Sequence, residues 1–232
     1  MEIIPALLEP TPTALVHQIN RLAPFFSRFQ IDIADGVYVT NTTVTVAEAL
    51  TAIANPRPGA ASPVSFDLHL MVKDYETQLK TVERLSRRIK INAVLIHASL
   101  SPDYPRLARQ FSFPIGLVIN PNASIKQLDK HYALSNLPVI QVMSIFPGRQ
   151  GQTFIPETLN KIEQLRRIGY RNKIFLDGGI NDRTLPLICQ HRDWPDALCI
   201  GSYLARSNDI AGTLDRLKTQ LGRASPPNQF LP

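Results

Sequence analysis

The segment FQIDIADG (residues 29–36) is an apolar, β-branched run that leads into acidic residues and a glycine. The segment KIFLDGG (residues 173–179) has the same arrangement much later in the chain. Each is typical of a β-strand with a carboxylate at its carboxyl end, Asp32 in the first and Asp177 in the second. In a parallel barrel the carboxyl ends of the strands converge on one face, which holds the active site. The two segments therefore predict paired carboxylates suited to proton transfer on either side of a small substrate.

Eight strand-like runs recur along the chain, and several gaps between them have the apolar spacing of helices. The predicted strands are residues 2–8, 29–33, 64–70, 93–97, 115–119, 139–143, 173–177 and 197–200. The predicted helices include residues 13–22, 75–89 and 156–168. This alternation predicts an α/β fold, a (β/α)₈ TIM barrel in a single domain. An open doubly wound sheet is the alternative, but such sheets usually carry a glycine fingerprint after the first strand, where this chain has Glu9 and Pro10.

The ends of the domain and its longest loop are marked by composition. We predict that the barrel covers residues 1–222 and that residues 223–232 form a disordered tail, because the tail has no periodicity. The proline-rich stretch at residues 56–63 is predicted to be a loop before the third strand.

Composition narrows the class of protein. No apolar run approaches the roughly 18 residues of a membrane span, and the N-terminus lacks the basic start of a signal peptide. Two cysteines without metal-type spacing favour a reducing, cytoplasmic setting. The net charge is +6, but the basic clusters lie in predicted helices and aromatics make up only 7% of the chain, which argues against nucleic-acid binding. A basic surface could attract anionic sugar phosphates. The sequence leaves open whether the chain forms a homo-oligomer.

A histidine joins the two aspartates at a third strand end. The run FDLHLM (residues 66–71) places His69 beside Met71 at the carboxyl end of its strand. Asp32, His69 and Asp177 together could bind a divalent metal. Taken singly, Asp32 could instead form the turn at Asp35–Gly36, and His69 could be a hydrogen-bonded core histidine.

Small residues follow the last three predicted strands, and they predict a phosphate site. Backbone N–H groups at glycines can approach an anion closely, and the loops after late barrel strands often hold a phosphate. Each dipeptide alone could be an ordinary turn. The candidate phosphate-binding residues are Gly148, Gly151, Gly178, Gly179, Gly201 and Ser202.

These motifs resemble the ribulose-phosphate 3-epimerase family over essentially the whole chain. The resemblance rests on Asp32 with Asp35, Gly36 and Asn41, on the Asp67–Met71 strand, on the segment MSIFPGRQGQTFIP (residues 143–156), and on the Asp-Gly-Gly and Gly-Ser pairs. It implies that the chain inverts C3 of a ketopentose phosphate through an enediolate. Asp32 and Asp177 would be the acid/base pair and metal ligands, and His69 would be a third ligand. His69, Met71, the glycines and Ser202 would bind the substrate.

The chain departs from the family pattern near this site. Gln30 stands where the family has a fourth metal ligand, a histidine, and an amide oxygen is a poorer ligand for zinc-like metals. Ala6 and Ala34 replace a serine and a methionine, and Arg149-Gln150 replaces Phe-Gly. The cofactor is expected to be zinc, iron, manganese or magnesium, bound weakly.

Three functions remain open at this stage. The first is the epimerase; the second is a catalytically impaired barrel that binds a phosphosugar, or an epimerase for a different sugar phosphate. The third is another phosphate-binding barrel enzyme, an isomerase or an aldolase. A Schiff-base aldolase would need a lysine at a strand end, whereas Lys73 and Lys126 fall in predicted loop or helix-start positions.

Overall fold

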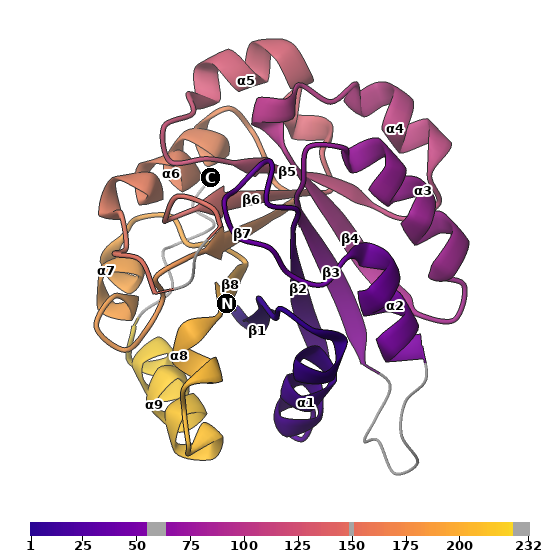
Figure 1. The fold of residues 1–232 in the computed structure, drawn as a ribbon. Helices are drawn as coiled ribbons and strands as arrows, with labels where there is room; N and C mark the ends of the chain where they lie inside the picture. Colours follow the sequence, from indigo (N-terminus) through magenta and orange to yellow (C-terminus); the bar gives the residue numbers. More distant parts are fainter. Residues whose placement is uncertain (55–63, 149–150, 225–232) are drawn as a thin grey trace.

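The protein forms a closed barrel of parallel strands, seen in a computed structural model that describes residues 1–54, 64–148 and 151–224 (Figure 1). The strands follow one another around the barrel in chain order, and β8 closes it by pairing with β1. The strands are β1 (Glu2–Leu7), β2 (Arg28–Ala34), β3 (Ser65–Met71), β4 (Lys90–His97), β5 (Ile115–Ile119), β6 (Val139–Met143), β7 (Lys173–Asp177) and β8 (Ala197–Ile200). The predicted TIM barrel is therefore confirmed.

Helices surround the barrel in the alternating order expected of βαβ units (Figure 1). They are α1 (Pro12–Leu22), α2 (Val46–Ala54), α3 (Tyr75–Leu85), α4 (Tyr104–Gln110), α5 (Ile125–Tyr132), α6 (Leu159–Arg167), α7 (Leu185–Gln190), α8 (Ser202–Ala205) and α9 (Ile210–Arg223). Short 3₁₀ turns occur at Ala98–Leu100, Leu134–Asn136 and Pro156–Thr158.

Two predicted helices differ from the structure at their ends. The helix predicted over residues 75–89 stops at Leu85, because the Ser86 N–H caps the last turn and Ile89 N–H bonds back to the Ser86 carbonyl. The helix predicted over residues 156–168 starts as a 3₁₀ turn and becomes α-helical at Leu159. Arg223, placed in the predicted tail, is the last residue of α9, whereas residues 225–232 and 56–63 lie outside the described residues.

Strand alternation sorts the side chains into two apolar layers. On β2, Phe29, Ile31 and Ile33 point outward into the large core between barrel and helices. The inner layer fills the barrel itself, and it includes Ile4, Leu95, Val118, Phe175 and Cys199. Because successive residues alternate, Gln30 and Asp32 share the inner face.

An ion pair between the half-buried Arg28 and the buried Asp67 lies toward the amino end of the barrel. Arg28 donates to both carboxylate oxygens of Asp67 at 2.7 and 3.0 Å, and its guanidinium lies 5.0 Å from the ring centre of Phe175. Asp67 is therefore committed to Arg28. The register pairs Asp32 with His69 and Met143 with Asp177, so the chemistry-bearing side chains meet at the opposite, carboxyl end.

Candidate active site

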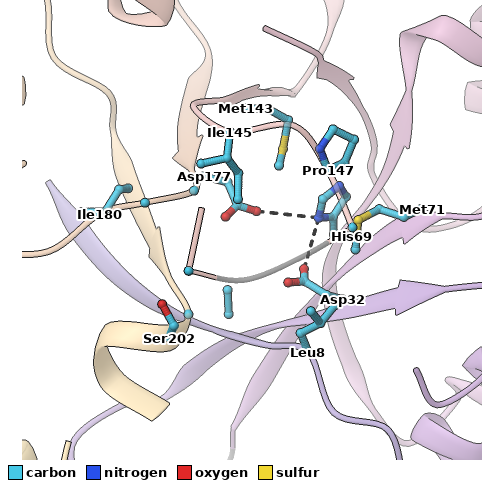
Figure 2. Close-up of a pocket in the computed structure, with 16 residues that line it drawn as sticks. Leu8, Asp32, His69, Met71, Met143, Ile145, Pro147, Asp177, Ile180 and Ser202 are labelled. Carbon is cyan, nitrogen blue, oxygen red and sulfur yellow. Dashed lines mark hydrogen bonds and ion pairs between the residues drawn. The ribbon is translucent and has the colours of Figure 1, made fainter. Parts of the chain in front are cut away.

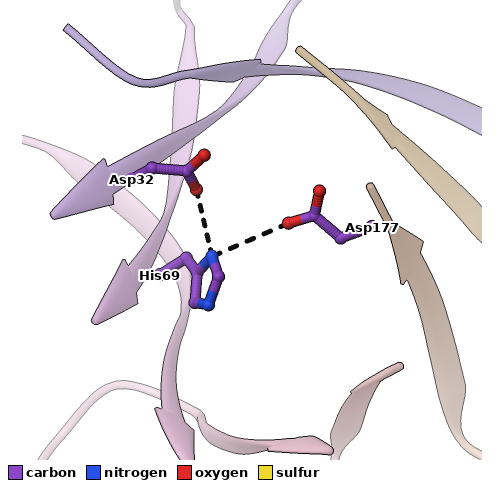
Figure 3. Close-up of side chains that lie close together, drawn as sticks. All are labelled: Asp32, His69 and Asp177. Carbon is purple, nitrogen blue, oxygen red and sulfur yellow. Dashed lines mark hydrogen bonds and ion pairs between the residues drawn. The ribbon is translucent and has the colours of Figure 1, made fainter. Parts of the chain in front are cut away.

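Three ionisable side chains converge at the carboxyl ends of β2, β3 and β7 (Figure 3). His69 Nδ1 lies 3.1 Å from Asp32 Oδ1 and 3.6 Å from Asp177 Oδ2. One candidate ligand atom from each residue lies within 4.8 Å of the others, and all three side chains are buried. The structure thus brings together the residues that the strand ends predicted, although their roles stay predictions.

Gln30 lies one layer deeper and bridges the two carboxylates. Its Nε2 donates to Asp32 Oδ1 at 2.8 Å and to Asp177 Oδ2 at 2.7 Å. Gln141, from β6, donates to the same Asp177 oxygen at 2.9 Å. The Gln30 Oε1 is buried and has no hydrogen-bond partner among the described residues. The amide therefore holds the carboxylates together as a neutral donor.

The surroundings of the site shift the pKa values of Asp177 and His69. Burial and the nearby charge of Asp32 raise the pKa of Asp177 to about 7, although His69 and the Gln30 amide oppose the rise. Burial alone would lower the pKa of His69, but the hydrogen bond and charge of Asp32, with the charge of Asp177, outweigh it and raise that pKa. A carboxyl group titrating near neutrality is suited to both giving and taking a proton.

A second histidine, which the sequence analysis missed, supports the first from behind. His97 ends β4, and its Nε2 lies 2.9 Å from His69 Nε2. His97 Nδ1 lies 2.9 Å from the Oδ1 of Asn120, the residue after β5. Burial and the charge of His69 lower the pKa of His97 well below its ordinary value, against the Asn120 hydrogen bond. His97 is therefore a neutral partner of His69.

The donor set fits a divalent metal. Two carboxylates and one imidazole are ligands that zinc, iron or manganese accept. The two ends of an amide differ little in size, so a half-turn of the Gln30 amide would replace its N–H donor with Oε1, an oxygen ligand, facing the carboxylates. That half-turn gives up both Gln30 hydrogen bonds, so a metal must compete with them.

A single pocket connects this cluster to the predicted phosphate-binding loops (Figure 2). In Figure 2, Ser202 lies across the pocket from His69, at the start of α8. Apolar side chains that the sequence analysis did not select, such as Ile145 and Pro147, also line it. All of the predicted site residues lie on its wall: Asp32, His69, Met71, Gly148, Gly151, Asp177, Gly178, Gly179, Gly201 and Ser202.

Gly178 shows why the β7 loop needs a glycine. Its φ of +117° is a left-handed conformation, and a Cβ there would lie 2.4 Å from Ile145 Cγ1. The Ser144 hydroxyl donates to the carbonyls of Asp177 and Gly178 at 3.0 and 2.6 Å, which ties the β6 loop to the end of β7.

Only some of the residues that depart from the family pattern line the pocket. Ala6 lines it, whereas Ala34 is buried and is not among its lining residues. The departures at Arg149 and Gln150 lie outside the described residues. The guanidinium of Arg206 packs beside Gly151, with Nη2 3.4 Å from the position of a Cβ on that glycine. Arg206 therefore places positive charge beside Gly151, one of the predicted phosphate-binding residues, although Arg206 is not among the residues that line the pocket.

The chain is similar in sequence to a family of known proteins. The sequence matches the profile of the ribulose-phosphate 3 epimerase family over residues 2–205. The ribulose-phosphate 3-epimerase of Escherichia coli K12 is 29% identical over 201 residues, which cover 84% of each chain. The Helicobacter pylori protein of the same name is 28% identical over 221 residues, or 90% of this chain and 93% of the relative.

Solved structures similar to this one share its fold. A 3-hexulose-6-phosphate synthase from Salmonella typhimurium aligns with a TM-score of 0.67 at 12% identity, covering 97% of this chain and all of that one. A 3-keto-L-gulonate-6-phosphate decarboxylase from Vibrio cholerae aligns at 0.66 and 16% identity, covering 97% and 99%. In the described part of the chain, each helix is too short or too polar to cross a membrane.

Proposed function

Because the chain belongs to the ribulose-phosphate 3-epimerase family, we propose that it inverts C3 of a ketopentose phosphate, of the ribulose 5-phosphate and xylulose 5-phosphate type. The observation that carries the proposal is the placement of Asp32 and Asp177 in one small pocket with His69. Inversion needs a proton removed from one face of a carbon and another delivered to the opposite face. Two carboxylates from β2 and β7 supply both groups.

The two aspartates take different protonation states before the reaction. Asp177, with a pKa raised to about 7, is the group that holds a proton near neutrality. Asp32, hydrogen-bonded to His69 Nδ1 and Gln30 Nε2, is the base that accepts the C3 proton in one direction of the reaction. Asp177 then delivers its proton to the other face of C3, and the roles exchange in the reverse direction. A carboxyl group whose raised pKa keeps its proton near neutrality is a general way to supply the acid for such chemistry.

Asp32, His69 and Asp177 would hold the divalent metal, with Gln30 as a further oxygen ligand after its amide turns. When bound, the metal supplies positive charge that stabilises the oxygens of the enediolate.

The glycine loops would fix the other end of the substrate. Gly178 and Gly179 follow β7, Ser202 opens α8, and all three line the pocket, so their backbone N–H groups are the proposed donors to the phosphate. Arg206 adds a charge beside Gly151. A phosphate held there would orient C3 of a five-carbon sugar towards the aspartates, and binding energy from such a remote group helps the reacting centre.

The direct test is the conversion of ribulose 5-phosphate, followed by carbon-13 NMR with added Mn²⁺, Fe²⁺ or Zn²⁺. Xylulose 5-phosphate is expected to appear, and Asp32→Asn or Asp177→Asn is expected to abolish it while the phosphate end still binds. The second candidate, a non-catalytic phosphosugar-binding barrel, is favoured by the Gln30 amide that occupies both carboxylates. Binding without turnover under every metal condition would support that candidate instead.

A further inference from the structure

A line of hydrogen bonds runs from the candidate metal site into the loops that follow β2, β4 and β5. It passes from His69 Nε2 to His97 Nε2 at 2.9 Å and from His97 Nδ1 to Asn120 Oδ1 at 2.9 Å. It continues from Asn120 Nδ2, which donates to Tyr38 Oη at 3.2 Å, and ends at the hydroxyl of Ser99, 2.8 Å from Tyr38 Oη. We call these residues the His97 relay.

The orientation of the Asn120 amide sets where His97 carries its hydrogen. An amide oxygen only accepts hydrogen bonds, so His97 Nδ1 must carry the hydrogen that points at Asn120 Oδ1. His97 is completely buried, and its hydrogen-bond partners among the described residues are a second imidazole and an amide, not a carboxylate. A buried imidazole without an anionic partner stays neutral, so its Nε2 has a lone pair.

The state of His97 in turn sets the state of His69. Only one of two imidazole nitrogens 2.9 Å apart can carry the shared hydrogen, and His97 Nε2 carries none. His69 must therefore hold a hydrogen on Nε2. Its Nδ1, 3.1 Å from Asp32 Oδ1 and 3.6 Å from Asp177 Oδ2, is the nitrogen that faces the carboxylates, and it can ligate a cation that displaces the hydrogen it shares with Asp32.

The geometry points to His97 and Asn120 as positioning residues: they keep a hydrogen on His69 Nε2, so that Nδ1 is the nitrogen that ligates a divalent cation. The expected change in metal affinity rests on the proposed metal site. Tyr38 contributes by holding the Asn120 amide and by packing its ring 4.7 Å from that of His97. Partners of this kind commonly change metal affinity by roughly 10- to 100-fold when removed.

Two variants of Asn120 with side chains of nearly equal size test the direction of the hydrogen bonds in the His97 relay. Asn120→Asp keeps an oxygen acceptor for His97 Nδ1 and should leave metal affinity within about threefold of the native value. Asn120→Leu removes the acceptor and lets His97 take either tautomer, so affinity for Mn²⁺ and Co²⁺, measured by calorimetry, should fall about tenfold or more. Asn122→Leu, at an exposed position two residues further on, is the matched control and should change nothing.

Nitrogen-15 NMR of the imidazoles in metal-free protein tests the relay even if metal binding or epimerase activity is absent. The expected result is a hydrogen on His97 Nδ1 and on His69 Nε2, with the His97 assignment lost in Asn120→Leu and kept in Asn120→Asp. A hydrogen on His97 Nε2, or Asn120→Asp weakening metal binding as much as Asn120→Leu, would show that the relay runs the other way and would overturn the inference. Failure of the proposed function alone would leave the NMR result unchanged.

Discussion

Replacing Gln30 with histidine tests how the hydrogen bonds of Gln30 limit the affinity of this site for a metal. In the native protein the Gln30 amide donates to Asp32 and Asp177 at 2.8 and 2.7 Å, and a cation must displace both bonds before Oε1 can face it. Hydrogen bonds to charged groups contribute about 1.5 kcal/mol or more each, so the two together cost about 3 kcal/mol. Since about 1.4 kcal/mol corresponds to tenfold in affinity, Gln30→His should bind metal about 100-fold more tightly.

The assay is a competition titration of Zn²⁺ and Mn²⁺ against a chromophoric chelator, together with the metal content of freshly purified protein. The native protein should bind metal weakly and have low epimerase activity, and Gln30→His should raise both. Gln30→Met, which removes the donor without adding a ligand, is the matched control and should gain less than the histidine. Stoichiometric, tightly bound metal and fast turnover in the native protein would refute the reasoning, as would a histidine variant no better than methionine.

Three further outcomes follow from the site. Asp32→Asn and Asp177→Asn should each lower kcat by roughly 10²- to 10⁴-fold with little change in KM, the usual range for loss of a general acid or base. If steady-state kinetics gave a near-native kcat for either variant, that residue would take no part in the proton transfer. Arg206→Ala should raise KM for the sugar phosphate with kcat nearly unchanged, because Arg206 lies beside Gly151, in the loop proposed to bind the phosphate, and is not one of the proposed acid/base residues. An unchanged KM would place the phosphate elsewhere. In metal-free protein the contribution of Asp177 to the free energy of unfolding should fall as pH rises from about 4 to about 7, because the pKa of Asp177 is raised to about 7 in the folded state and the folded protein therefore holds a proton that the unfolded chain has lost. Because the lowered pKa of His97 acts in the opposite direction, the measurement is the difference between native protein and Asp177→Asn in urea denaturation with a chelator. A stability of the native protein that rises relative to Asp177→Asn over this range would contradict the assignment.

The barrel could be predicted from the sequence because each strand is a distinct β-branched run. Predicted and observed bounds coincide for β5, β6, β7 and β8. The aspartates and His69 were found by one rule, that polar residues at the carboxyl ends of barrel strands face the site. The predicted helix extended beyond its observed end at Leu85, because the apolar spacing continues to Ile89 although the backbone leaves the helix at Ser86.

The remaining site residues depend on contacts between strands that no local pattern records. Gln30 was noticed only as a missing histidine, whereas the structure shows an amide that bridges two carboxylates. Gln141 is a polar residue within an apolar strand, and its contact with Asp177 requires the β6–β7 register. His97 and Asn120 end or follow strands β4 and β5, so the strand-end rule, applied to every strand, would have selected both.

The central claim is that two carboxylates exchange protons with opposite faces of C3. It is tested most directly by converting ribulose 5-phosphate in D₂O and measuring deuterium at C3 of both sugars early in the reaction. The account predicts that xylulose 5-phosphate carries deuterium at C3 from the first turnovers, while the remaining ribulose 5-phosphate is labelled more slowly. Unlabelled xylulose 5-phosphate, or a metal-loaded protein that binds ribulose 5-phosphate and exchanges no C3 proton, would contradict it.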